Sequence, residues 1–353
     1  MSCGCFTLRR NKSPSLETSE HVNFVPTHLF HMGQHTTKEP PVATKAEEDE
    51  ETYRLRIDGD LEEERPADLP PSSRLSYGHL TVINTLPSEP STNKEQPLLR
   101  RSEEHIEVVV KRYLSDSKGP KDFQQEYRLL RDVLGPHPNL VRVFSCHDNY
   151  GMLCMPRYRG CVYTLMCDPS VALDSRDVRN LFAQMATAVA YCHARLVAHR
   201  DVKLENFLVD VRHADPRPYT PDRALVKLTD FEFSSQFRDM DALVEVHCGS
   251  VNYASPELLS SHPYSPFASD VWALGVALHV MQFREYPFGH PSGTAKQTAQ
   301  AIVNTRLRLD DTCTGSLRRV LEGTMCHNVP RRLTASKLVV HDYITTQDVV
   351  DRP

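Results

Sequence analysis

The sequence predicts an α+β fold, and three segments carry that prediction. The run Val108-Val109-Val110 is apolar and β-branched, which is typical of a buried strand. Residues 123–130 and residues 180–193 have the apolar spacing of helices. Lys111 ends the strand, and a charged residue at the end of a buried strand needs a charged partner. Glu126, on the first of the two helices, is the candidate partner.

The chain of 353 residues divides near position 73. Before that point Ser, Thr, Pro and Glu dominate, and acidic runs occupy residues 47–51 and 62–64. Such a segment has too little apolar surface to fold, so we expect residues 1–72 to be disordered and the acidic runs to be solvated. We expect residues 73–345 to form one domain and residues 346–353 to form a short tail.

Composition limits the function classes. The net charge of −5 argues against nucleic acid as a main partner, because a protein that binds a phosphate backbone presents a basic surface. The ten cysteines show no pair spacing typical of zinc sites, and no signal peptide precedes them. No apolar run approaches the roughly 20 residues that span a bilayer. We therefore expect a cytoplasmic protein in a reducing compartment, and a monomer.

Cys3 and Cys5 are the one close pair of cysteines, with Arg9, Arg10 and Lys12 behind them. Palmitoylation of both cysteines, aided by the basic residues, would give a weak attachment to an anionic membrane. Two exposed cysteines in a disordered tail are the competing interpretation.

The run from His199 to Asn206, HRDVKLEN, resembles the catalytic loop of protein kinases, H-R-D-x-x-x-x-N. In that family the Asp accepts the proton of the substrate hydroxyl and the Asn holds a magnesium ion. The resemblance implies these roles for Asp201 and Asn206. Lys203 is the residue typical of serine/threonine kinases and would neutralise the γ-phosphate. A polar surface loop without function is disfavoured, because partner motifs follow in the family's order.

The first partner motif is KLTDFE, residues 227–232, which resembles the strand and turn that carry D-F-G. The resemblance implies that Asp230 binds the magnesium bridging the β- and γ-phosphates and that Phe231 packs under the regulatory helix. Downstream, residues 249–257 resemble the end of an activation segment, with Ser-Pro-Glu in place of Ala-Pro-Glu. Residues 270–275, DVWALG, resemble the family's buried central helix. Arg332 matches the arginine that pairs with the final Glu of the segment, here Glu257.

The resemblance covers about residues 75–345 and implies a two-lobed protein kinase fold. A small β-rich lobe of about residues 73–158 would precede a helical lobe of about residues 159–345. Residues 212–223, rich in proline and charge, would form an exposed loop between two short strands. The residues that the resemblance assigns to ATP are Lys111, Glu126, Met155, Tyr158 and Leu208, with Met155 and Tyr158 at the hinge.

Two departures from the family pattern matter. The glycine-rich loop that covers the phosphates should lie shortly before the Lys111 strand, but residues 86–92 read LPSEPST, with no glycine between Gly78 and Gly119. Proline has no N–H to donate, and Glu89 would repel phosphate. Glu232 replaces the glycine of D-F-G, where glycine permits backbone angles closed to other residues, and its carboxylate alters the charge at the metal site.

These departures also resemble the Tribbles pseudokinases, which lack a good glycine-rich loop and carry Glu at the same position. Those proteins have lost the metal-binding Asp, whereas Asp230 and Asn206 are present here. We predict an ATP- and Mg²⁺-dependent serine/threonine kinase that acts on protein substrates in intracellular signalling. A scaffold with weak or no turnover is the alternative.

The activation segment resembles that of the calmodulin-dependent and AMP-activated kinase groups. Their phosphorylated threonine lies two residues before Cys-Gly-Ser, where this chain has Val246, and no Ser or Thr occurs between Ser235 and Ser250. We predict that the segment needs no phosphorylation. Glu245 offers Arg200 a permanent carboxylate in one interpretation and is a solvated glutamate in the other.

Overall fold

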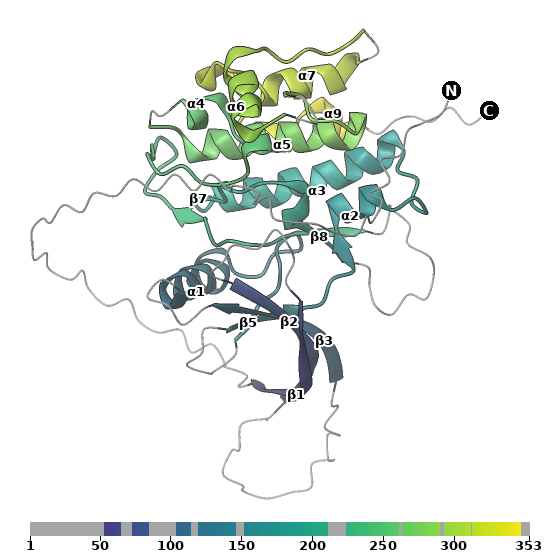
Figure 1. Ribbon diagram of the computed structural model, residues 1–353, viewed down its shortest axis with the longest axis vertical. Helices are drawn as coiled ribbons and strands as arrows, with labels where there is room; N and C mark the ends of the chain where they lie inside the picture. The colour runs from purple at the N-terminus through teal and green to yellow at the C-terminus, as the bar shows by residue number, and fades with distance from the viewer. Residues whose placement is uncertain are drawn as a thin grey trace, which may run out of the picture. The chain divides into compact units, whose positions relative to one another are not determined.

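The computed structural model of the chain describes residues 53–64, 73–84, 104–113, 119–145, 152–210, 224–260, 263–289, 293–311 and 313–346. All of them belong to one unit of the chain, residues 41–353 (Figure 1). The α+β prediction is confirmed, because an antiparallel sheet with one helix precedes a larger group of helices. No helix in these ranges has the length and apolar character to cross a membrane.

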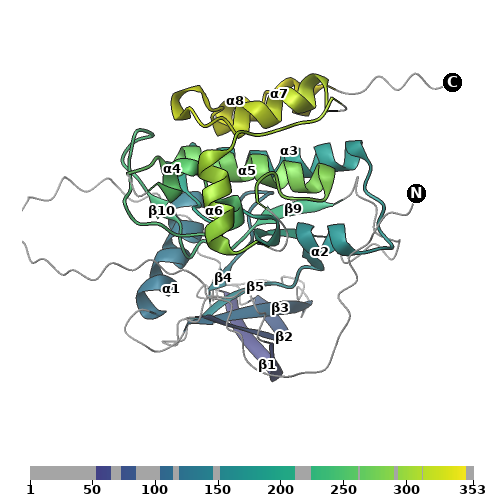
Figure 2. The same ribbon diagram turned by 45° about the horizontal axis from the view of Figure 1, so that its top comes forward.

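The first part is a five-stranded antiparallel sheet in the order β1-β2-β3-β5-β4. Its strands are β1 (Tyr53–Glu64), β2 (Ser73–Asn84), β3 (Glu104–Tyr113), β4 (Phe144–Ser145) and β5 (Met152–Pro156). The predicted strand at Val108–Val110 is thus the middle of β3, and Lys111 pairs in register with Leu153 of β5. Helix α1 (Gly119–Arg128) continues as a π-helical turn, Leu129–Leu134, and lies beside the sheet (Figures 1 and 2).

Strand β1 corrects the expected boundary at residue 73. It lies within the segment 1–72 that was predicted to be disordered, and it pairs with β2 along most of its length. Two segments connect the strands that precede Lys111: residues 65–72 join β1 to β2, and residues 85–103 join β2 to β3. Neither contains a glycine, and both, including the predicted window 86–92, lie outside the described residues.

The second part is mainly helical. Its longer helices are α3 (Ser175–His193), α5 (Pro266–Phe283), α6 (Ala295–Asn304) and α7 (Gly315–Thr324), and its short ones are α2 (Val162–Cys167), α4 (Pro256–Leu259), α8 (Ala335–Leu338) and α9 (Asp342–Thr345). Asp174 caps α3 in a reciprocal capping box with Asp177, which satisfies amides at the start of the helix. Helix α5 is buried along most of its length and packs against α3 and α7 (Figure 1).

Two small antiparallel sheets carry the loops of the site. Strand β8 (Phe207–Asp210) pairs with β6 (Gly160–Cys161) and β9 (Leu225–Leu228), and β7 (Val197–Ala198) pairs with β10 (Ser235–Gln236). Single 3₁₀ turns lie at Leu204–Asn206, Val251–Tyr253 and Val329–Arg331. Strands β8 and β9 flank the predicted loop 212–223, which itself lies outside the described residues. The tail 346–353 also lies outside them, apart from Thr346.

Candidate active site

Lys111 lies among three carboxylates. Its Nζ is 2.8 Å from Oδ1 of Asp230, 2.9 Å from Oε2 of Glu126 and 3.5 Å from Oε2 of Glu232. The Lys111 side chain is only 4% exposed. Burial lowers the pKa of Lys111, but the neighbouring carboxylates outweigh this effect and hold it well above its ordinary value. The lysine is therefore a fixed positive charge at the end of β3.

Glu126 connects helix α1 to this lysine and to the turn that follows β9. While one of its oxygens pairs with Lys111, the other accepts the backbone N–H of Phe231 at 3.1 Å. The hydroxyl of Tyr113 also donates to Glu126. The side chain of Phe231 is fully buried, with its ring edge-on to the ring of His199. One glutamate thus links three segments that lie far apart in the sequence.

The backbone of the turn differs from what the glycine argument predicts. Asp230 has the left-handed φ of +63°, whereas the φ of Glu232 is not positive. Glu232 therefore adopts ordinary backbone angles, and the expected strain at this position does not arise. Burial raises the pKa of Asp230, but the ammonium of Lys111 outweighs burial and holds the pKa below its ordinary value. Asp230 is thus ionised in this position.

The carboxylate of Asp201 accepts hydrogen bonds at both oxygens. Oδ1 receives the N–H and hydroxyl of Ser250 at 3.1 and 3.2 Å. Oδ2 lies 3.0 Å from Nζ of Lys203 and 3.2 Å from Nδ2 of Asn206. Lys203 also donates to the Ser250 hydroxyl at 3.2 Å. These contacts fix the orientation of the carboxylate and leave Asp201 6% exposed.

The backbone of this loop is held from helix α5. Asp270, which is 2% exposed, accepts the N–H groups of His199 and Arg200, both at 2.8 Å. Its carboxylate also contacts Nε2 of His193 at 2.9 Å. Arg200 has a φ of +70°, so the loop turns sharply just before Asp201. The buried Asp270 therefore stabilises an unusual backbone angle beside the predicted base.

The two groups of site residues adjoin each other. The N–H of Thr229, next to Asp230, donates to the carbonyl of Asn206 at 3.0 Å. Burial lowers the pKa of Lys203, but Asp201 chiefly, and Asp230 to a smaller extent, raise it above its ordinary value. Asp230 thus contributes to the electrostatic environment of both lysines.

The three remaining predicted residues lie on neighbouring elements. Met155 is buried on β5 and pairs in register with Val109 of β3. The hydroxyl of Tyr158 accepts the N–H of Arg142 at 3.4 Å, and Leu208 is half-buried on β8.

Arg200 contacts the activation segment differently from the prediction. Its guanidinium donates to the backbone carbonyls of Phe233 at 3.3 Å and Val246 at 2.7 Å. No ion pair joins it to Glu245, although both residues belong to the described part of the chain. The interpretation of Glu245 as a permanent carboxylate partner is therefore wrong, and Glu245 is an exposed side chain.

The predicted pair between Arg332 and Glu257 is present. Guanidinium Nη2 lies 2.9 Å from Oε2 of Glu257, and the guanidinium carbon lies 5.0 Å from the centre of the Trp272 ring. This pair joins the end of the activation segment to the helical core.

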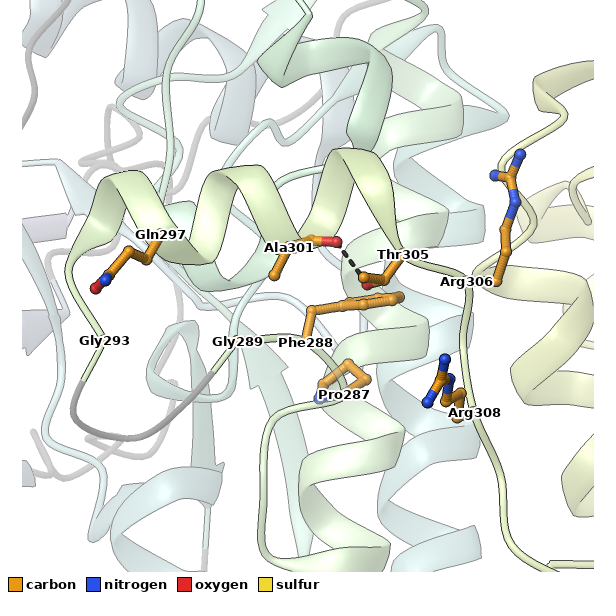
Figure 3. Close-up of a pocket in the computed structure, with 9 residues that line it drawn as sticks. All are labelled: Pro287, Phe288, Gly289, Gly293, Gln297, Ala301, Thr305, Arg306 and Arg308. Atoms are coloured by element: carbon orange, nitrogen blue, oxygen red, sulfur yellow. Dashed lines mark hydrogen bonds between the residues drawn. The ribbon is translucent and has the colours of Figure 1, made fainter.

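A cavity of about 650 Å³ lies elsewhere, between helix α6 and the chain segments on either side of it (Figure 3). It is lined by Pro287, Phe288, Gly289, Gly293, Gln297, Ala301, Thr305, Arg306 and Arg308. None of the predicted site residues lines it. The candidate site therefore rests on the convergence of Lys111, Asp201 and Asp230, with their charges, and not on this cavity.

Two contacts at the site were not anticipated from the sequence. They are the hydrogen bond from Tyr113 to Glu126 and the approach of Glu232 to Lys111. Tyr113 lies two residues after Lys111 on the same strand, so the alternation of side chains puts both on one face. That periodicity is a usable signal for Tyr113, whereas no local pattern points to the Glu232 contact.

A family model for the protein kinase domain matches residues 98–344. Among curated relatives, testis-specific serine/threonine-protein kinase 5 from Mus musculus is 32% identical over 203 residues, covering 53% of this chain and 50% of that protein. Testis-specific serine/threonine-protein kinase 3 from Homo sapiens is 30% identical over 237 residues, covering 64% of this chain and 83% of that protein. NUAK family SNF1-like kinase 1 from Homo sapiens is 30% identical over 184 residues, covering 52% of this chain and 26% of that protein. The chain thus spans about half the length of the mouse relative.

Proposed function

Because the chain belongs to the protein kinase family, we propose that it is a serine/threonine kinase that transfers the γ-phosphate of ATP to protein hydroxyls in intracellular signalling. The observation that carries the proposal is the arrangement around Asp201, whose carboxylate is oriented by Ser250, Lys203 and Asn206. A positioned base and a neighbouring ammonium are what phosphoryl transfer requires of a protein. The serine/threonine kinases among the relatives support the same class.

The residues present fit a magnesium nucleotide. Magnesium prefers oxygen ligands, and the Asn206 amide and the Asp230 carboxylate offer them. Asn206 uses its amide nitrogen toward Asp201, which leaves the amide oxygen for a cation. Lys111 contacts Oδ1 of Asp230, and the Asp230 side chain is still 18% exposed. When bound, MgATP supplies the phosphoryl group, and Asn206 and Asp230 would hold its metal.

The chain's own residues then perform three tasks. Asp201 accepts the proton of the substrate hydroxyl, since the contacts with Ser250, Lys203 and Asn206 fix the orientation of its carboxylate. Lys203, within 3.2 Å of the Ser250 hydroxyl, stabilises the charge that moves onto the transferred group. Lys111 binds phosphate oxygens at the end of β3, held in place by Glu126. Positioning and electrostatics supply most of the rate in this chemistry.

The alternative is a kinase-shaped scaffold with weak or no turnover. Glu232 beside Lys111 favours it, because a carboxylate then competes with phosphate for the lysine. The relatives do not favour it, since they are named as kinases. For the whole protein we further propose a cytoplasmic monomer that does not bind nucleic acid, with weak membrane attachment through Cys3 and Cys5, which lie outside the described residues.

The experiment compares radiolabelled phosphate transfer to casein by wild-type protein, Asp201→Asn and Asp230→Ala. We expect Asp201→Asn to lower the rate by roughly 10²–10⁴-fold, the usual contribution of a positioned base, and we expect Asp230→Ala to lower the rate because it removes a proposed metal ligand. Asp239→Asn, a change at an exposed aspartate outside the site, is the matched control and should retain wild-type activity. Equal background transfer by the wild type and both site variants would reject the enzyme and favour the scaffold.

A further inference from the structure

Glu232 places a third carboxylate against a single ammonium. Its Oε2 lies 3.5 Å from Nζ of Lys111, and its side chain is 3% exposed. Glu126 and Asp230 already pair with the same nitrogen at 2.9 and 2.8 Å. Three carboxylates therefore approach the one ammonium of Lys111 in a region where little water screens them.

These carboxylates lie where the proposed function places the phosphates of ATP. Glu126 has structural partners of its own in the Phe231 amide and the Tyr113 hydroxyl, and Asp230 belongs to the metal site. Glu232 is the residue that adds the third charge. A phosphate chain without a metal ion carries several negative charges of its own, and like charges close together in a poorly screened region repel strongly.

A divalent cation on the nucleotide reverses this relationship. It removes most of the charge that Glu232 repels, and its own positive charge is attracted to the same carboxylate. The effect of Glu232 on binding must therefore depend on whether the nucleotide arrives with or without its metal.

We propose that Glu232 is a specificity-determining residue that makes this site discriminate against metal-free nucleotide in favour of the metal–nucleotide complex. It does so by occupying Lys111 and by repelling uncompensated phosphate. This inference rests on the proposed function, because it assumes that nucleotide binds beside Lys111.

The test measures ADP affinity by isothermal titration calorimetry in excess EDTA and in excess Mg²⁺, for wild type, Glu232→Gln and Glu232→Gly. Removing the charge should tighten metal-free binding at least roughly tenfold and change binding with Mg²⁺ by less than about threefold. The factor by which Mg²⁺ improves affinity should therefore shrink at least roughly threefold. Glu245→Gln removes an exposed carboxylate that makes no ion pair with Lys111 and should leave both affinities unchanged.

Asp230→Asn provides the opposite pattern, because it removes a proposed metal ligand and should weaken binding in Mg²⁺. Two variants at position 232 guard against a folding defect in either one, which far-ultraviolet circular dichroism would reveal. If wild type binds ADP in Mg²⁺ and neither variant changes the ratio of the two affinities, the inference is wrong and the proposed function stands. If neither the wild type nor any variant binds ADP, with or without Mg²⁺, the inference and the proposed function are both wrong.

Discussion

The guanidinium of Arg200 donates a 2.7 Å hydrogen bond to the backbone carbonyl of Val246, at the position that carries a phosphorylated threonine in the kinase groups this segment resembles. The hydroxyl of Tyr264 donates to the same carbonyl at 3.1 Å. Val244 and Tyr264 also exchange two backbone hydrogen bonds. Arg200 therefore contacts a backbone carbonyl of this segment where those kinases use a phosphate.

We predict that activity survives phosphatase treatment and depends on Arg200. Arg200→Gln should lower phosphate transfer roughly tenfold, because it removes a charged hydrogen-bond donor from the segment beside Asp201. Glu245→Gln should change transfer by less than about twofold, since Glu245 makes no ion pair with Arg200. Transfer to casein before and after phosphatase treatment checks this. Loss of activity traced to a phosphosite in the activation segment, residues 230–257, would contradict it.

A second prediction concerns Gly249, whose φ is +96°. A Cβ at this position would lie 2.7 Å from the carbonyl oxygen of Arg200 and 3.3 Å from Oδ1 of Asp201. Gly249→Ala should therefore displace the base and lower kcat by roughly tenfold or more. Gly315→Ala is the control, because Gly315 also has positive φ but would have no neighbour within 4 Å of its Cβ. Similar kcat values for the two variants would show that backbone strain, and not the contact with Asp201, is what matters.

The ion pair between Arg332 and Glu257 should be important for stability. The Arg332 side chain is 0% exposed, so Glu257→Gln leaves the buried guanidinium without its carboxylate partner. This change should lower the free energy of unfolding by about 3 kcal/mol. Asp342→Asn breaks the pair of Arg319 and Asp342, whose side chains are 60% and 44% exposed, and should lower the free energy of unfolding far less, because water screens an exposed ion pair. Urea denaturation of both variants measures the difference. Equal losses would indicate that Arg332 finds other partners.

A fourth prediction concerns pH. Burial lowers the pKa of His279 below 6.5, the ordinary value that applies in the unfolded chain. The unfolded chain therefore binds more protons just below neutrality, and the free energy of unfolding should fall as pH drops through this range. His279→Gln should make the fall shallower, because it removes one such group. Urea denaturation at about pH 7.5 and about pH 5.5 tests this, and an unchanged slope in the variant would contradict it.

Much of the site could be predicted because its chemistry fixes residue types at short spacing. Asp201, Lys203 and Asn206 lie within one loop, and the carboxylate of Asp201 contacts the other two. The helix predicted at residues 180–193 is the C-terminal part of α3, since periodicity alone identifies a long amphipathic helix. Family membership followed from the order of the motifs, and the match to residues 98–344 confirms it.

What could not be predicted depends on tertiary placement. Strand β1 was missed because the acidic composition of its C-terminal end, Glu62–Glu64, was given more weight than its alternation. Tyr53, Leu55 and Ile57 alternate with polar residues, a period-two pattern that could have identified the strand. Charge alone left two interpretations of Glu245 open, as a partner of Arg200 or as a solvated side chain. The guanidinium contacts main-chain carbonyls instead, and the side-chain pattern of a sequence does not identify such contacts.

The position of Asp270 has a consequence for how natural variants of this chain should be classified. Asp270 and His193 lie deep in the helical part, where a burial-based score would register any substitution as a folding defect. Yet Asp270 accepts the amide of Arg200, directly before Asp201. A variant here that still accumulates in cells at normal levels would be inactive without being unstable. Abundance screens would score such alleles as benign, so they need an activity measurement beside the expression measurement.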